Sequence, residues 1–343
     1  MTDRDMTAAI NALATETGFA RVGIAPAEPL AADVMRRWLD RGFHGQMDYL
    51  ARNFSKRCNP AELVDGTRSI ICLAMPYVSP AAAGELTVAA YAQGRDYHAA
   101  LKTMCLNFMD RLSLFCRARG LEAFSGRAFV DSAPVMEHTL AARAGIGWIG
   151  RNGCLTVEGL GSYVLLAEVF CNLSLTPDEP IPDQCGDCGR CREACPTRAF
   201  VGDKLIDARR CVSYLTIEHE GDIEPSLRAA IGNRVLGCDE CQRACPHNQG
   251  LAPQPNALGD ATIAARCGAL TLQAVLRWSR DDWDAFTRGT AMRRCGYEAF
   301  LRNVVICAGN SGRRDLAEAL AAVGRSCPAL QALVDWALGR LSD

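Results

Sequence analysis

Eight of the eighteen cysteines lie in one segment of the chain, from Cys185 to Cys245. The first four follow the spacing Cys185-x2-Cys188-x2-Cys191-x3-Cys195-Pro196. Bacterial ferredoxins use this spacing to hold [4Fe-4S] clusters, with three thiolates on one cluster and the fourth on its neighbour. A second run, Cys238-x2-Cys241-x3-Cys245-Pro246, ends in the same way. The segment therefore predicts two [4Fe-4S] clusters.

The second run is one ligand short, because Val235 stands where a further cysteine would complete the pattern. Cys211 is the candidate for the missing ligand. Two clusters need eight thiolates. The predicted sets are then Cys185, Cys188, Cys191 and Cys245 for one cluster, and Cys195, Cys211, Cys238 and Cys241 for the other.

Zinc is the alternative metal, because tetrahedral zinc sites also use C-x2-C pairs. Zinc does not require a third cysteine three residues on, nor the C-x3-C-P ending, so the spacing favours clusters. The other ten cysteines lie in apolar patterns, where a thiol is usually a small buried hydrophobe. This interpretation covers, among others, Cys72, Cys105, Cys116, Cys154, Cys171 and Cys307.

Composition and charge exclude several classes of protein. The chain has 343 residues and is 49% hydrophobic and 22% charged, which is ordinary for a globular protein of two or three units. Its apolar runs fall far short of the roughly 20 residues of a membrane span, and no signal region opens the chain. We expect a reduced, cytoplasmic protein with no membrane partner. The net charge of -2 means that any nucleic-acid contact comes from a local basic patch.

Strands alternate with helices up to about residue 175, which indicates an α/β (α+β) domain. Apolar spacing predicts helices at 3–17, 97–119 and 134–144, and strands at 20–25, 69–75, 127–131, 154–157 and 162–170. A proline-rich acidic stretch, 176–183, looks like a linker. From residue 261 the pattern is helical throughout and suggests HEAT-like repeats. The predicted domains are 1–178, a ferredoxin-like module at 179–255 and a helical unit at 256–343.

The glycines from Gly145 to Gly150 form a G-x-G-x-x-G, but they follow a helix and do not open one. They are therefore a weak dinucleotide fingerprint and a better fit to a turn.

Four further motifs together resemble one family. They are Gln93-Gly94-Arg95-Asp96-Tyr97-His98, the stretch from Phe129 to His138, the turn from Gly145 to Asn152, and the stretch from Cys211 to Glu218. With the cysteine runs they resemble epoxyqueuosine reductase, over nearly the whole chain. The resemblance implies an enzyme that reduces epoxyqueuosine to queuosine at the wobble position of tRNA anticodons. Residues 1–178 would then bind cobalamin, which receives electrons from the clusters.

The family is related in its cofactor domain to corrinoid reductive dehalogenases. The D-x-H-x-x-G box of His-ligated cobalamin proteins is missing, because Asp96-Tyr97-His98 lacks the required glycine. A base-off cobalamin without a His ligand is implied. The resemblance places cobalamin contacts on Arg57, Arg95, Tyr97, His138, Asn152, Ser162 and Ser213.

Removal of the epoxide oxygen as water needs protons, and the resemblance places the acid on Asp131. We expect burial against the corrin to raise the pKa of this carboxyl and keep it protonated near neutrality. From the residues alone, a position at the start of a helix is the favoured interpretation of Asp131, since Asp-Ser-Ala-Pro precedes a predicted helix.

Basic residues of the cluster segment and the C-terminal helices are candidate phosphate contacts for tRNA: Arg228, Arg293, Arg294 and Arg302. A solvated helix face is the alternative. The wobble base would have to be splayed out to reach the cofactor. The implied enzyme is a monomer that uses an unidentified external electron donor.

Two other functions fit the same residues. One is a corrinoid reductase of a small-molecule substrate, which would not need the C-terminal helices. The other is an iron–sulfur electron-transfer or RNA-binding protein without catalysis. Cobalamin binding separates the second from the enzymes, and dependence on tRNA separates the first.

Overall fold

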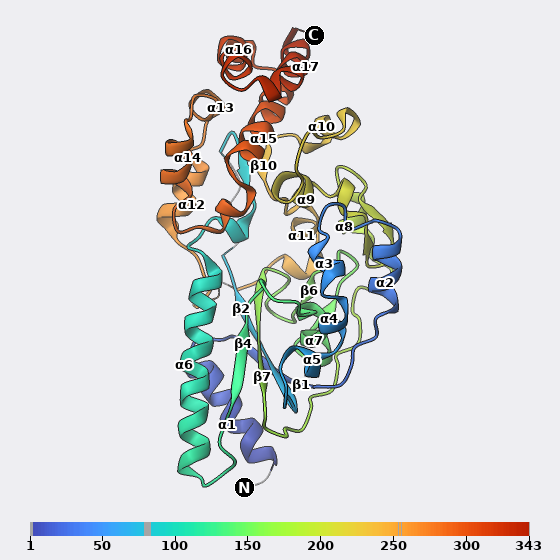
Figure 1. The fold of residues 1–343 in the computed structure, drawn as a ribbon, viewed down its shortest axis with the longest axis vertical. Helices are drawn as coiled ribbons and strands as arrows, with labels where there is room; N and C mark the ends of the chain where they lie inside the picture. Colours follow the sequence, from blue (N-terminus) through green and yellow to red (C-terminus); the bar gives the residue numbers. More distant parts are fainter. Residues whose placement is uncertain (1–2, 79–83, 253, 255, 343) are drawn as a thin grey trace.

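The computed structural model describes residues 3–78, 84–252, 254 and 256–342. Its lower half in Figure 1 is built on a sheet of four strands in the order β1-β2-β7-β4. Every neighbouring pair is antiparallel. The bounds are β1 Arg21–Pro26, β2 Ser69–Pro76, β4 Gly126–Phe129 and β7 Val164–Cys171. The predicted alternation of strands and helices is therefore of the α+β kind, without parallel crossovers.

Helices cover both faces of this sheet. Helices α1 (Asp3–Glu16) and α6 (Tyr97–Ala118) pack on one face, and α7 (Glu137–Arg143) packs on the other. Because side chains alternate along a strand, Ala167 and Val169 of β7 face α6, whereas Leu166 and Phe170 face α7. Strand β2 is buried along its whole length, as expected for the centre of three layers.

The predicted helices at 3–17 and 97–119 are confirmed to within a residue or two. Asp96 caps α6, because its side chain accepts a hydrogen bond from the His98 backbone N–H. The predicted helix at 134–144 begins late, at Glu137, because Val135 N–H bonds the Ala133 carbonyl in a turn. Four short helices between β1 and β2 were not predicted: α2 Asp33–Asp40, α3 Tyr49–Arg52, α4 Phe54–Cys58 and α5 Pro60–Leu63.

The turn from Gly145 to Gly150 follows α7 and leads into a two-stranded ribbon of β5 (Trp148–Ile149) and β6 (Leu155–Thr156). A side chain on Gly147 would lie 2.1 Å from the Thr156 carbonyl oxygen, so glycine is needed there for close packing. This agrees with the interpretation of the motif as a turn.

The cysteine-rich segment is made of short elements. Two four-residue helices each carry one cysteine of a run: α8 carries Cys191 of the first run and α11 carries Cys241 of the second. Both helices end two residues before a Cys-Pro pair. Ala194 N–H and Ala244 N–H close both helices in the same way, onto Arg190 and Glu240 carbonyls. The bounds are α8 Arg190–Glu193, β8 Phe200–Gly202, β9 Leu205–Ile206, α9 Val212–Ile217, α10 Pro225–Ile231, β10 Arg234–Leu236 and α11 Glu240–Arg243.

The upper part of Figure 1 is helical, as the sequence pattern predicts. Its helices are α12 Ala261–Gly268, α13 Leu272–Val275, α14 Arg280–Thr287, α15 Tyr297–Asn310, α16 Ala317–Ser326 and α17 Gln331–Ser342. None of the helices in the described part of the chain has both the length and the apolar character to cross a bilayer.

One hydrophobic core joins this helical part to other segments. It contains residues of α15, α16 and α17, together with residues 208–236 and 86–92. Strand β3 (Thr87–Val88) pairs in parallel with β10, far from it in sequence. The core thus contains residues from both sides of the predicted domain boundary between 255 and 256. Residue 255 itself lies outside the described residues.

Candidate functional site

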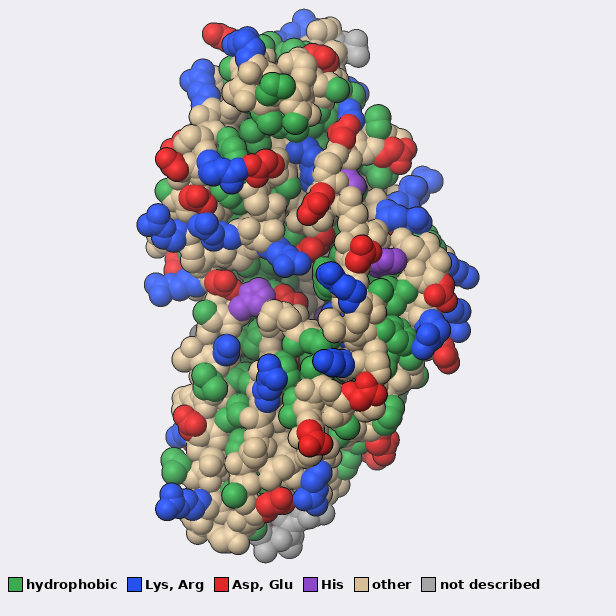
Figure 2. All heavy atoms as spheres, in the orientation of Figure 1, with side chains coloured by type: hydrophobic (Ala, Val, Ile, Leu, Met, Phe, Trp, Pro, Cys, Tyr) green, Lys and Arg blue, Asp and Glu red, His purple; other side chains and the backbone are tan. Residues whose placement is uncertain are grey.

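A cavity of about 1550 Å³ lies at the waist of the molecule. Its wall comes from the segment of α2–α4, the loop after β4 with the start of α7, the segment of β9 and α9, and the helical turn Ala291–Cys295. Figure 2 shows a hollow at this level of the molecule, with Lys and Arg side chains above and below it. The volume exceeds the roughly 300–1,000 Å³ of ordinary small-molecule pockets.

Asp131 reaches this cavity from the loop that follows β4. Its backbone has a φ of 54°, a left-handed conformation that aspartate adopts more readily than most residues. Its backbone N–H donates to Glu137 Oε1 at 2.5 Å, which ties the loop to the first turn of α7. The Asp131 side chain is 55% exposed, and it is among the residues that line the cavity.

Two side chains of α6 hold the Asp131 carboxylate. The Tyr97 hydroxyl donates to Asp131 Oδ2 at 2.5 Å, and His98 Nε2 lies 3.0 Å from the same oxygen. The His98 hydrogen bond has the largest effect on the pKa of Asp131 and lowers it. Burial opposes this, but the Tyr97 hydrogen bond and the charge of His98 add to the lowering, so the pKa falls below its ordinary value. Donors around the carboxylate thus lower its pKa in this structure, whereas the rise expected from burial against the corrin stays a prediction.

Two other carboxyl groups near Asp131, those of Glu137 and Glu168, have raised pKa values. Burial and the charge of Asp131 raise the pKa of Glu137 to about 8. Glu168 of β7 is fully buried, and neither of its carboxyl oxygens has a hydrogen-bond partner among the described residues. Burial and the charge of Glu137 raise its pKa strongly. Burial therefore favours the protonated form of both groups, which lie next to the Asp131 loop.

Of the seven predicted cofactor contacts, four line the large cavity: Arg57, Tyr97, His138 and Ser213. The other three lie elsewhere. Arg95 pairs with Asp260 beside a smaller cavity, and the Ser162 hydroxyl is buried and donates to Gln242. Asn152 borders the cavity of the first cysteine set.

Cysteines of each predicted set lie near one another, and their division between two clusters stays a prediction. Cys185, Cys188, Cys191 and Cys245 line one small cavity beneath the glycine turn. Cys211 lies close enough to Cys195 and Cys241 for their charges to interact. Cys238 lies equally within range of Cys211 and Cys241. Among the described residues, no three such side chains are spaced to hold a single metal ion.

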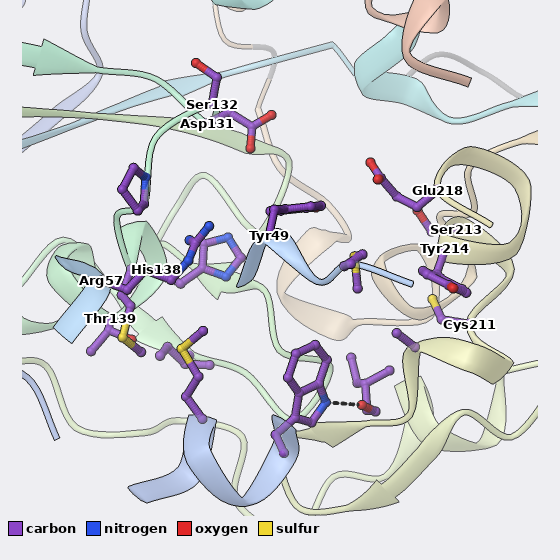
Figure 3. A pocket seen from close by; sticks show the side chains of 18 of the residues that line it. Tyr49, Arg57, Asp131, Ser132, His138, Thr139, Cys211, Ser213, Tyr214 and Glu218 are labelled. Carbon is purple, nitrogen blue, oxygen red and sulfur yellow. Dashed lines mark hydrogen bonds between the residues drawn. The ribbon is translucent and has the colours of Figure 1, made fainter. Parts of the chain in front are cut away.

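One cysteine of the second set, Cys211, borders the large cavity. Cys211 lies in the cavity wall next to Ser213 and Tyr214, across the space from Asp131 (Figure 3). Cys154, predicted to be a buried core thiol, is only half-buried and hydrogen-bonds with Cys241. Of the nine remaining cysteines outside the two predicted ligand sets, eight are buried as predicted and Cys327 is half-buried.

Two predicted tRNA contacts are not available to a phosphate. The Arg302 side chain belongs to a residue only 3% exposed and donates to the carbonyls of Leu215, His219 and Gly221. Arg228 is equally buried and bonds Asp222 and the Ile223 carbonyl. Both guanidinium groups stabilise loops of the cluster segment. The prediction of phosphate contacts is wrong for these two.

The other two arginines are accessible. Arg293 pairs with Asp284 on the surface. Arg294 donates two hydrogen bonds to Glu218, at 2.8 and 3.0 Å, and lies over the Tyr49 ring at the cavity wall.

Replacing Arg302 by methionine is expected to lower the free energy of unfolding by roughly 3 kcal/mol, because three buried carbonyls lose their donor. The urea midpoint under anaerobic conditions measures this. Arg293→Met is the matched control and should change stability by less than about 1 kcal/mol, since its ion pair is exposed. Equal stability of the two variants would contradict a structural role for Arg302.

Sequence reasoning missed His98, Glu137, Glu218 and Tyr49 as members of this site. For His98 and Glu137 a signal existed, because both lie inside motifs that carry the family resemblance. Glu218 also ends one of those motifs, the stretch from Cys211 to Glu218. Tyr49 lies in none of them, so only the tertiary structure finds it.

Comparison with known proteins gives a consistent result. Residues 57–132 match the sequence model described as "Epoxyqueuosine reductase QueG, DUF1730", and residues 184–248 match a "4Fe-4S double cluster binding domain". The epoxyqueuosine reductase of Pseudomonas aeruginosa is 40% identical, covering 95% of this chain and 91% of its own. The epoxyqueuosine reductase of Alicycliphilus denitrificans is 39% identical, covering 90% of this chain and 89% of its own.

Solved structures agree over the whole chain. A crystal structure of epoxyqueuosine reductase with an epoxyqueuosine-modified tRNA-Tyr stem loop has a TM-score of 0.86 at 26% identity, covering 100% of this chain and 92% of that one. The Bacillus subtilis enzyme, described with an aspartate catalytic loop swung out of the active site, has a TM-score of 0.87 at 25% identity and the same coverage. The chain belongs to the epoxyqueuosine reductase family.

Proposed function

We propose that the chain reduces epoxyqueuosine to queuosine in tRNA, with electrons from two [4Fe-4S] clusters and with cobalamin in the large cavity. One observation carries the proposal: Asp131 and Cys211 border the same cavity. A carboxyl group that can deliver protons and a predicted ligand of an electron-carrying cluster thus face one space. The second set, Cys195, Cys211, Cys238 and Cys241, would hold the cluster nearer the substrate.

The cavity residues suit a large cofactor that is apolar on its faces and carries amides at its rim. Met35, Met47 and Leu165 offer apolar contacts along the wall. Arg57 Nε is buried and has no hydrogen-bond partner among the described residues, so it can donate to an amide oxygen. His138 Nδ1 is 2.9 Å from the Gly153 carbonyl, which leaves Nε2 as an acceptor. When bound, cobalamin would supply the reducing centre for the epoxide.

Arg293 and Arg294 are the proposed tRNA contacts, because both are exposed beside the cavity wall formed by the turn Ala291–Cys295. The related enzyme solved with a modified tRNA stem loop supports a tRNA site in this family. We propose the same division of labour as the sequence suggests: cofactor binding by residues 1–178, clusters in 179–255, and tRNA contacts from HEAT-like helices in 256–343.

Anaerobic reconstitution with iron, sulfide and cobalamin tests the proposal. We expect about eight irons and one cobalamin per chain, followed by conversion of epoxyqueuosine to queuosine in tRNA when a low-potential reductant is added. The product is measured by mass spectrometry of the digested tRNA. The free epoxyqueuosine nucleoside is the matched substrate and should react much more slowly, because it lacks the phosphate contacts.

Two outcomes would favour the other functions. Equal turnover of a small epoxide or halide would indicate a corrinoid reductase of small molecules. Eight irons without any affinity for cobalamin would indicate an electron-transfer protein.

A further inference from the structure

Three side chains form a hydrogen-bonded chain that leads to the Asp131 carboxylate. Asp96 Oδ1 lies 2.7 Å from His98 Nδ1, and His98 Nε2 lies 3.0 Å from Asp131 Oδ2. The imidazole therefore bridges two carboxyl groups, one through each ring nitrogen.

The position of the imidazole is fixed by the start of α6. Asp96 caps the helix and accepts the His98 backbone N–H with the same oxygen that binds the ring. The ring stacks on Tyr97 with 4.1 Å between centroids, and the Tyr97 hydroxyl bonds Asp131 Oδ2. Few rotamers of His98 keep all of these contacts.

The proposed reaction consumes two protons. Removing the epoxide oxygen breaks two C–O bonds, forms one C=C bond and releases water, with two electrons arriving from an external one-electron donor through the clusters. One carboxyl group delivers one proton at a time, so it must be reloaded within each turnover. His98 and Asp96 are 37% and 41% exposed, so protons from solvent can reach them.

His98 is suited to reload Asp131, and its neighbours are less so. The hydrogen bond to Asp131 has the largest effect on the pKa of His98 and raises it. Burial opposes this, but the hydrogen bond to Asp96 adds to the rise, so the pKa lies above its ordinary value. Burial and the charge of Asp131 raise the pKa of Tyr97 far above neutrality, which makes it a poor acid. Glu137 meets Asp131 through the backbone N–H of Asp131, not through its carboxylate. Arg294 acts on Asp131 only through its charge.

We propose that His98 resupplies the proton that Asp131 gives to the substrate, and that Asp96 holds the imidazole in its protonated, bridging state. This relay rests on the proposed function and deepens it. His98 acts through Asp131 and need not touch the substrate. The relay matters most when substrate and cofactor fill the cavity, because they then separate Asp131 from the solvent in it.

The variants His98→Gln and Asp96→Asn test the relay. His98→Gln should lower kcat roughly 10- to 100-fold with little change in the KM for tRNA. Activity of the wild type should fall as pH rises through the pKa of His98, and this limb should vanish in His98→Gln. Added imidazole should restore part of the rate. Asp96→Asn keeps the helix cap, because an amide oxygen also accepts the His98 N–H, but it should shift the limb to lower pH.

A readout without turnover is the titration of the His98 ring by NMR in the substrate-free protein. Its pKa should lie above the ordinary value of about 6.5 and should fall in Asp96→Asn and in Asp131→Asn. A wild type that is active while His98→Gln keeps its full rate and pH profile would overturn the relay alone. The relay alone would also be overturned if the wild type were active and the pKa of His98 were the same in the wild type, in Asp96→Asn and in Asp131→Asn. A wild type that does not reduce epoxyqueuosine in tRNA would overturn the proposed function, and the relay with it.

Discussion

Asp131→Asn is expected to lower the rate of epoxyqueuosine reduction by at least about 100-fold, because the carboxyl group is the proposed proton donor. Asparagine tolerates the left-handed backbone at this position as well as aspartate does, so the loop should keep its conformation. The amide still accepts the hydrogen bond from Tyr97. The loss should therefore appear in kcat at every pH from 6 to 9, with iron content and tRNA affinity unchanged.

Glu62→Gln is a matched control, since it removes an exposed carboxylate bonded to Ser55 and Asn59 outside the cavity. It should leave the rate unchanged. If Asp131→Asn kept full activity across the pH range, Asp131 would not be the acid, and Glu137 would be the next carboxyl group to test.

Cys211→Ala is expected to remove one cluster, so that iron falls from about eight to about four per chain. Cys211 is the N-cap of α9, and it is the one predicted ligand that belongs to neither cysteine run. Because Cys211 lies in the wall of the large cavity, turnover should be lost together with the iron. Iron analysis and the visible spectrum of the anaerobically reconstituted protein measure the change.

Cys307→Ala is the matched thiol control. This cysteine is buried within α15, far in sequence from the ligands, so its loss should lower stability modestly and leave eight irons. A Cys211→Ala protein that retained about eight irons would show that another group completes the site. Cys154, which hydrogen-bonds with Cys241, would then be the candidate.

Local chemistry explains what could be predicted from the sequence. The two cysteine runs follow from their spacing, whereas Cys211 lies outside both runs and is proposed only because two clusters need eight thiolates. The long helix α6 follows from its apolar stripe and from the cap at Asp96. The position of Asp131 in the cavity wall follows from the family motif, although its backbone conformation does not.

Tertiary contacts explain what could not be predicted. Arg302 and Arg294 lie near each other in sequence and have the same chemistry. Arg302 is buried against the carbonyls of the α9 loop, whereas Arg294 remains at the surface. A linear pattern does not show which guanidinium will meet buried carbonyls. The lowered pKa of Asp131 was missed for the same reason, because it depends on donors from a distant helix.

The shared core of the cluster segment and the C-terminal helices has a consequence for the newly made protein. Cys211 and Cys238 pack against a core to which α15, α16 and α17 contribute most of the later residues. The Asn303 amide of α15 also donates to the carbonyls of Thr216 and Val235, which lie between these two cysteines in the sequence. All eight cysteines leave the ribosome before those helices do. Insertion of the second cluster should therefore follow the end of translation, and a chain cut short after the cysteines should stay without it.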